Sequence, residues 1–323
     1  MGYSSVSKKN LLIRGLLGLT ILTIVIYSID LNLIPAFKKI EHYYFLVIAL
    51  FFPLLINPII SNYRWKIILN AQGIDERFFS LVRITFISTF VGLPLPSSTG
   101  SDAIRIFISE RRNRKREGAG GAAVIIDRLI GFYILSLLGI IGSLYLISKG
   151  MSFNLFYIVL FINISILFLF WIIKSDLIFS KIIHLVSRIK KLEPLTMYVS
   201  QLNNALNVFP YKRILLYIIP LIILFQLSTM FCGFLIFKSF GIGLPFFYHL
   251  AFLPLISIIS IIPLSISGFG LREGGFVYFY GLLGVDSNIL FLISLLYYFI
   301  LTMIPAVIGM FYYVLGNNSF KLK

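Results

Sequence analysis

Three pairs of oppositely charged residues lie within or beside long apolar segments of this chain. They are Asp102 with Arg105, Asp127 with Arg128, and Arg272 with Glu273. A charge inside hydrocarbon costs at least about 2.5–3.5 kcal/mol on insertion scales, so it faces a helix-bundle interior or water and has a partner. Guanidinium groups stay charged and bind phosphate bidentately. We therefore predict that these six side chains line one polar site for a phosphate-bearing head group. The alternatives are a split arrangement and ion pairs that only join helices.

Two of these pairs follow interruptions of an apolar segment by helix-breaking residues. The first interruption contains Pro94, Pro96 and Gly100, and the second contains Pro263, Gly268 and Gly270. At membrane depth, an interrupted helix is tolerated only against protein or a water-filled cavity. Paired interruptions in the two halves of a chain are typical of a transport site. We predict that both breaks border the substrate site and that the exposed helix ends supply backbone N–H donors.

The composition is that of a helical membrane protein. Hydrophobic residues make up 59% and charged residues 12% of the chain, about half the charge of an ordinary soluble domain. Several apolar runs reach the roughly 20 residues that a helix needs to cross the bilayer. No alternating strands of about ten residues, typical of a transmembrane barrel, are found. We predict an all-α polytopic protein with a single integral membrane domain, residues 1–323.

The distribution of basic residues predicts the topology. The net charge of +16 lies mostly in short segments beside the apolar runs, which favours the positive-inside pattern over nucleic-acid binding. We expect six full spans, two re-entrant segments (84–104 and 246–284) and cytoplasmic termini, in the inner (plasma) membrane. The expected spans are 11–29, 43–60, 121–147, 153–173, 214–237 and 289–315. Arg64 and Lys66 are assigned to the cytoplasmic side after the second span. The alternative is a plain eight-span arrangement.

The chain divides into two halves around a polar segment. Residues 1–150 hold the first re-entrant segment, and residues 214–323 hold the second. Between them, 151–213 supplies one span and a basic cytoplasmic segment that we expect to include amphipathic helix at the lipid surface. A dip from inside in one half and from outside in the other is what an inverted repeat produces. We hypothesise such a repeat.

Metal and nucleotide sites are not expected, and no cofactor is predicted. His42, His184 and His249 lack ligand spacing, so we expect interfacial or loop histidines rather than metal ligands. The glycine-rich stretch 268–274 follows no predicted strand and is not followed by the Gly-Lys-Ser/Thr of a phosphate-binding loop. Neither pattern favours an enzyme.

Three stretches resemble the signature segments of a known membrane family. They are GLPLPSSTGSDAIR (92–105), VIIDRLIG (124–131) and PLSISGFGLREG (263–274). They are similar to those of the lysylphosphatidylglycerol synthase transmembrane, or flippase-like, family, over nearly the whole chain. The resemblance implies movement of lipids or lipid-linked sugars between leaflets.

This chain departs from the family at two of those segments. The family commonly has Gly-Glu at Ser101-Asp102 and Glu-Arg at Asp127-Arg128. Each change keeps the carboxylate and shortens it by one methylene. The larger synthases also carry a second membrane block and an aminoacyl-transfer domain. The printed sequence ends at residue 323 without these parts, so we do not expect synthase activity.

We therefore expect a non-enzymatic transporter for an anionic phospholipid or a polyprenyl-phosphate-linked sugar. Membrane lipids are the expected partners, without nucleic acid. A second copy of the chain and enzymes of glycolipid synthesis are further candidate partners. The alternatives are a membrane-embedded lipid or sugar-phosphate transferase and a small-solute secondary carrier.

Overall fold

The computed structural model describes residues 33–95, 99–113, 116, 118–151, 154–175, 193–265 and 267–315, which form helices and no β-strand. The helices are α2 Leu33–Lys38, α3 Tyr43–Phe51, α4 Asn57–Ala71, α5 Phe78–Gly92, α6 Gly100–Arg112, α7 Ala119–Ser148, α8 Asn154–Lys174, α10 Glu193–Val208, α11 Tyr211–Ser239, α12 Phe246–Ile259, α13 Leu271–Gly281, α14 Ser287–Tyr298 and α15 Ile304–Leu315. Two π-helical turns, η1 Phe52–Ile56 and η4 Phe299–Met303, join α3 to α4 and α14 to α15. The all-α prediction is confirmed.

Five helices of the described chain are long and apolar enough to span a membrane. They are Tyr43–Ala71, Ala119–Ser148, Asn154–Ile172, Tyr211–Ser239 and Ser287–Leu315. Four of them contain a span predicted from the sequence, and Asn154–Ile172 matches the predicted span 153–173 to within one residue at each end. The remaining predicted span, 11–29, lies outside the described residues. The chain is a multi-pass membrane protein.

The two sequence interruptions separate pairs of short helices. Pro94 and Gly100 lie at the turn between α5 and α6, whereas Pro96 falls outside the described residues. Pro263, Gly268 and Gly270 lie between α12 and α13. At 1.5 Å per residue these four helices are about 17–22 Å long, shorter than the roughly 30 Å of hydrocarbon. That length suits hairpins that enter and return, although re-entry itself stays a prediction.

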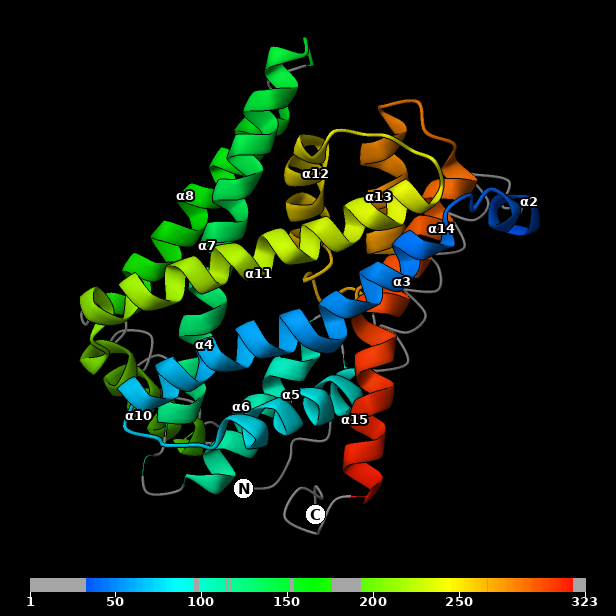
Figure 1. Cartoon of the computed structure of the whole chain (residues 1–323). Helices are drawn as coiled ribbons and strands as arrows, with labels where there is room; N and C mark the ends of the chain where they lie inside the picture. Colours follow the sequence, from blue (N-terminus) through cyan, green and yellow to red (C-terminus); the bar gives the residue numbers. More distant parts are fainter. Residues whose placement is uncertain are drawn as a thin grey trace.

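The order of elements repeats along the chain. A helix of 29 or 30 residues, a short-helix hairpin and a second helix of that length occur first in 43–148 and again in 211–315. In Figure 1 the α5–α6 hairpin lies in the lower half of the molecule and the α12–α13 hairpin in the upper half. Their turns meet, because the Ser267 N–H donates to the Leu95 carbonyl at 3.3 Å. This arrangement agrees with the hypothesised inverted repeat.

Each hairpin packs against a long helix of the other half through a glycine. A Cβ on Gly309 of α15 would lie 1.9 Å from the Phe86 carbonyl oxygen of α5. A Cβ on Gly142 of α7 would lie 2.2 Å from the Ala251 backbone nitrogen of α12. Small residues allow helix backbones to approach this closely. Each half therefore packs its hairpin against the other half: α5 contacts α15, and α12 contacts α7.

A carboxylate fixes the start of α7 relative to α6. Glu110, near the end of α6, accepts the backbone N–H groups of Gly118 at 3.0 Å and Gly121 at 2.7 Å. These are N-terminal amides that the helix itself cannot satisfy. The Tyr198 hydroxyl of α10 lies 3.4 Å from Glu110. Burial of this tyrosine, followed by the Glu110 charge, raises the pKa of Tyr198.

The predicted end of the second span needs adjustment. The long helix Tyr43–Ala71 continues eleven residues beyond the predicted end of that span, so Arg64 lies inside the helix rather than after it. No helix-breaking residue occurs after Pro58 until Gly73, which explains the continuation. In the segment 174–213, α10 supplies a helix; residues 176–192 lie outside the described part.

Candidate binding site

A buried ion pair joins α4 to α7. Arg64 donates from Nε to Asp127 Oδ1 at 2.5 Å and from Nη2 to Oδ2 at 3.0 Å. Arg64 is 5% and Asp127 2% exposed. This two-point geometry is the strongest that arginine and a carboxylate form. The guanidinium of Arg64 also lies 5.3 Å from the ring centroid of Phe225 on α11.

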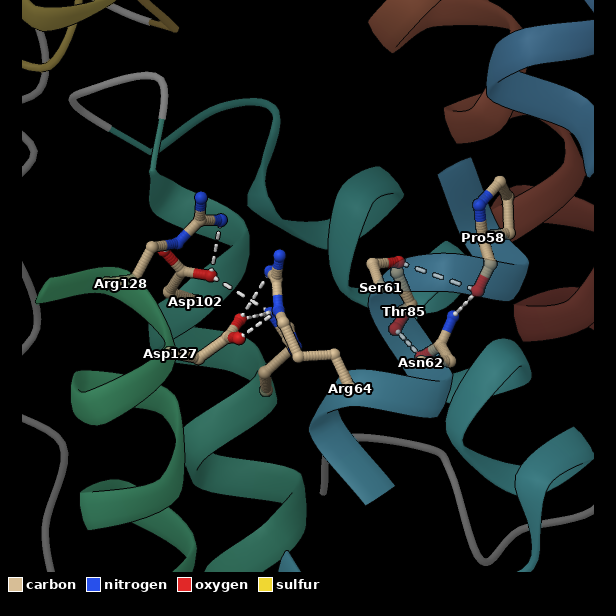
Figure 2. A network of polar contacts seen from close by, with 9 residues as sticks. Pro58, Ser61, Asn62, Arg64, Thr85, Asp102, Asp127 and Arg128 are labelled. Carbon is tan, nitrogen blue, oxygen red and sulfur yellow. Dashed lines mark hydrogen bonds and ion pairs between the residues drawn. The ribbon is translucent and has the colours of Figure 1, made fainter. Parts of the chain in front are cut away.

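A second ion pair joins α6 to α7, and a third arginine connects it to the first pair. Arg128 donates from Nε and Nη2 to the two carboxylate oxygens of Asp102, the latter contact being 2.7 Å. Arg105 lies 3.5 Å from Asp102 and 3.9 Å from Asp127. Its guanidinium stacks on Trp65 at 4.1 Å. Three helices thus bring five charged side chains into one cluster (Figure 2).

The length of α7 gives the position of this cluster along that helix. The helix has 30 residues and is about 45 Å long, and Asp127 lies about 12 Å from its N-terminal end. That position is about one-quarter of the way along the helix. The cluster is displaced toward the end of the molecule that carries the α6–α7 connection.

A partly open cavity of about 240 Å³ lies against the cluster. Arg64, Arg105, Asp127 and Arg128 line it together with Phe225. Hydroxyl and amide side chains of α4 and α5 continue the lining, and η4 closes part of it. The lining groups of that polar part are Asn57, Ser61, Thr85 and Thr89. The cavity is therefore cationic where the three arginines converge and neutral but polar along α4.

The cluster is not fully satisfied by protein groups. Arg64 Nη1 and Arg105 Nε are buried and have no hydrogen-bond partner. Within the cluster, three guanidinium groups face two carboxylates, which leaves one positive charge. Buried N–H groups without partners, and above all uncompensated buried charge, are unfavourable. An anion in the cavity would supply both the missing acceptors and the missing charge.

The remaining two predicted site residues lie in a separate cluster at the turn of the second hairpin. Arg272 pairs with Glu273 and stacks on Tyr298 at 3.9 Å. The other carboxylate oxygen of Glu273 accepts the Gly270 N–H at 2.6 Å, which caps α13. The Tyr298 hydroxyl donates to Ser267 Oγ at 3.0 Å. Neither Arg272 nor Glu273 lines the cavity, so the expected site is split in two.

Comparison with known proteins places the chain in a family. A family model described as the lysylphosphatidylglycerol synthase TM region matches residues 11–309. The chain belongs to that family. No curated protein and no solved structure matches it. Within this member of the lysylphosphatidylglycerol synthase TM family, two of the three signature segments, 92–105 and 124–131, supply four of the five clustered charges. The third segment forms the turn that touches the first.

Sequence reasoning did not find Arg64. It was assigned to a topology-determining basic group because the apolar run before it was given an end at residue 60. The available signal was its setting: Arg64 lies between Tyr63 and Trp65 in a segment that has no helix breaker before Gly73. A single arginine in such a segment calls for a carboxylate partner, and Asp127 is that partner.

One histidine differs from the expectation of an interfacial or loop position. His249 is buried in α12, and its Nδ1 lies 2.8 Å from the Tyr280 hydroxyl. His42 precedes α3 as expected, and His184 lies outside the described residues. Across the described ranges of this family member, no group of three or more His, Cys, Asp or Glu side chains could hold a metal ion.

Proposed function

We propose that this protein lets an anionic lipid head group cross the bilayer while the acyl or prenyl chains remain in lipid. The observation that carries the proposal is the convergence of three arginines on a partly open cavity, two of them with buried N–H groups that lack an acceptor. Phosphate oxygens are strong acceptors in the geometry that guanidinium favours. Membership of the family supports a role in the membrane and is compatible with this one.

The carboxylates hold the arginines in place when the site is empty. Asp102 is the partner that a phosphate replaces first, because its ion pair with Arg128 is the more exposed of the two. The Arg128 side chain is 38% exposed, compared with 6% for Arg64. The phosphate then reaches Arg105 and Arg64, which lie deeper. The Arg64–Asp127 pair remains intact as the floor of the site.

Motion of the hairpins exchanges access to the site. Asp102 and Arg105 belong to α6, whereas Asp127 and Arg128 belong to α7. A shift of the α5–α6 hairpin relative to α7 therefore separates Asp102 from Arg128 and opens the cluster. The hydrogen bond between Ser267 and Leu95 couples the two hairpin turns, so the second hairpin moves with the first. We place the protein in the inner membrane with cytoplasmic termini.

The test is lipid movement in reconstituted vesicles. Vesicles contain a trace of tail-labelled phosphatidylglycerol, and loss of fluorescence after addition of membrane-impermeant dithionite reports exchange between leaflets. Each of R64Q, R105Q and R128Q should slow the protein-dependent phase about tenfold or more, because a hydrogen bond to a charged group contributes about 1.5–3 kcal/mol. R112Q is the matched control: it also removes one guanidinium, but from an exposed pair with Glu76 at 3.3 Å.

Three results would contradict the proposal. The first is lipid movement at the wild-type rate in all three cavity variants. The second is turnover of the lipid into a new product when purified protein is incubated with candidate lipids and Mg²⁺, which would favour the transferase. The third is uptake of a water-soluble phosphate compound without movement of any lipid, which would favour the small-solute carrier.

A further inference from the structure

The charge of the cluster limits the charge of its ligand. Arg64, Arg105 and Arg128 against Asp102 and Asp127 leave a single positive charge. Four of these five residues are less than a tenth exposed. In such surroundings an uncompensated charge of either sign is strongly unfavourable. A ligand with one negative charge neutralises the cluster, whereas a phosphate monoester, at about −1.5 to −2 near neutral pH, leaves it negative.

The neutral part of the cavity carries hydroxyl and amide side chains. Asn57, Ser61 and Arg64 recur at intervals of four and three on one face of α4, so the polar lining extends about 10 Å from Arg64. Thr85 donates its hydroxyl proton to Asn62 Oδ1 at 2.6 Å, and Thr89 donates to the Thr85 carbonyl at 2.9 Å. Figure 2 shows Ser61, Asn62 and Thr85 together on the far side of Arg64 from Arg128.

Those hydroxyl groups have already used their protons within the protein. A hydroxyl has one donor and two acceptor lone pairs, so what the Thr85 and Thr89 side chains retain for a ligand is acceptor capacity. The matching ligand groups are donors such as alcohol O–H groups. The threonines of α5 therefore suit a hydroxylated group rather than a second phosphate.

The lining does not suit an ammonium group. Asp127 is the one carboxylate among the described residues that line the cavity, and both of its oxygens are engaged by Arg64. The net positive charge of the cluster also repels a cationic group on the ligand. A lysyl, ethanolamine or choline head group would thus bring a positive charge without a counter-ion.

We infer that the cavity selects a phosphodiester with one negative charge, followed by an uncharged, hydroxylated group such as glycerol, inositol or a sugar. This inference rests on the proposed function for the source of the ligand, a membrane lipid. The same chemistry could come from a water-soluble phosphodiester. The two sources differ in whether hydrocarbon chains contribute to binding.

Binding is tested separately from transport, by thermal stabilisation of the detergent-purified protein at pH 8. The lipid probes have two hexanoyl chains and differ only in the head group: phosphatidylglycerol, phosphatidylmethanol, phosphatidic acid and phosphatidylethanolamine. Phosphatidylglycerol should bind about fivefold more tightly than phosphatidylmethanol, which has the same charge but no alcohol, since a neutral hydrogen bond contributes about 1 kcal/mol. Phosphatidic acid and phosphatidylethanolamine should each bind at least about tenfold more weakly than phosphatidylglycerol.

Two variants test the two halves of the inference. D102N raises the cluster to two positive charges, so the preference should shift from phosphatidylglycerol toward phosphatidic acid. T89V keeps the shape of the side chain and the charge of the cluster, so it should weaken phosphatidylglycerol to the level of phosphatidylmethanol and leave phosphatidylmethanol unchanged. If D102N does not fold, T89V and the wild-type ranking still decide.

The outcomes separate this inference from the proposed function. Phosphatidic acid or phosphatidylethanolamine binding as tightly as phosphatidylglycerol would overturn the inference while leaving a lipid site. Equal binding of phosphatidylglycerol and phosphatidylmethanol, unaffected by T89V, would overturn the hydroxylated group. Glycerophosphoglycerol, which lacks both chains, binding as tightly as the lipid would support the inference but contradict the lipid source. If no probe stabilised the protein, both the inference and the proposed function would be overturned.

Discussion

The Arg64–Asp127 pair provides the sharpest test of how the cluster is held together. D127N leaves the guanidinium groups of Arg64 and Arg105 buried with no carboxylate between them and raises the cluster charge from +1 to +2. At a charge separation of about 4 Å and an effective dielectric constant of about 20, the lost attraction is about 4 kcal/mol. This agrees with the roughly 3–5 kcal/mol found when one partner of a buried pair is removed. R64Q should cost less, about 2 kcal/mol, because Asp127 keeps Arg105 at 3.9 Å.

The double variant R64Q/D127N distinguishes stability from function. It restores the cluster charge to +1 and places two amides where the ion pair was, so it should be more stable than D127N alone. We expect a coupling energy of about 2–3 kcal/mol. Lipid movement should nevertheless stay as slow as in R64Q, because the Arg64 donors are absent from the double variant.

The measurement is unfolding by SDS in mixed micelles, followed by tryptophan fluorescence. A W171F background leaves Trp65 as the single probe, since the chain has two tryptophans. Trp65 is fully buried and stacks on Arg105, so its emission reports on the cluster itself. The reasoning is refuted if the double variant loses as much stability as the two single variants added together. Recovery of full transport in the double variant would remove Arg64 from the ligand site.

Two further predictions concern the contacts that fix the hairpins. G309A should reduce the yield of folded protein sharply, because its Cβ would lie 1.9 Å from the Phe86 carbonyl oxygen. The control G131A, whose Cβ meets nothing within 4 Å, should be neutral or stabilising by up to about 1 kcal/mol. Equal monodisperse yields from both variants would contradict the packing of α5 on α15. Y198F should be less stable than the wild type by an amount that is constant below about pH 9 and shrinks above about pH 10. Because the pKa of Tyr198 is raised in the folded state by burial and by the Glu110 charge, the stabilising effect is fully present below the unfolded pKa and is lost as pH rises toward the folded pKa. A difference that does not change with pH in SDS unfolding would contradict the burial of Tyr198 against Glu110.

The sequence by itself determined the class of the protein and the position of its charges along the chain. Runs of about 20 apolar residues specify membrane helices because the bilayer sets the length and leaves no alternative for the backbone. The breaks at Pro94, Gly100 and Gly268 were also predictable, because proline and glycine act through the local backbone. Asp102, Arg105, Asp127 and Arg128 were identified since charges in apolar segments need partners.

Only the tertiary structure decided which charges meet. The sequence supplied two arginines for the cavity, and the fold added a third, Arg64, from a helix whose end was misplaced by eleven residues. Arg272 lies instead at the turn of the second hairpin, where it pairs with Glu273, the residue that caps α13. Pairing across helices depends on how two backbones approach, as at Gly309 and Phe86. That approach is a property of both partners at once, so neither segment encodes it alone.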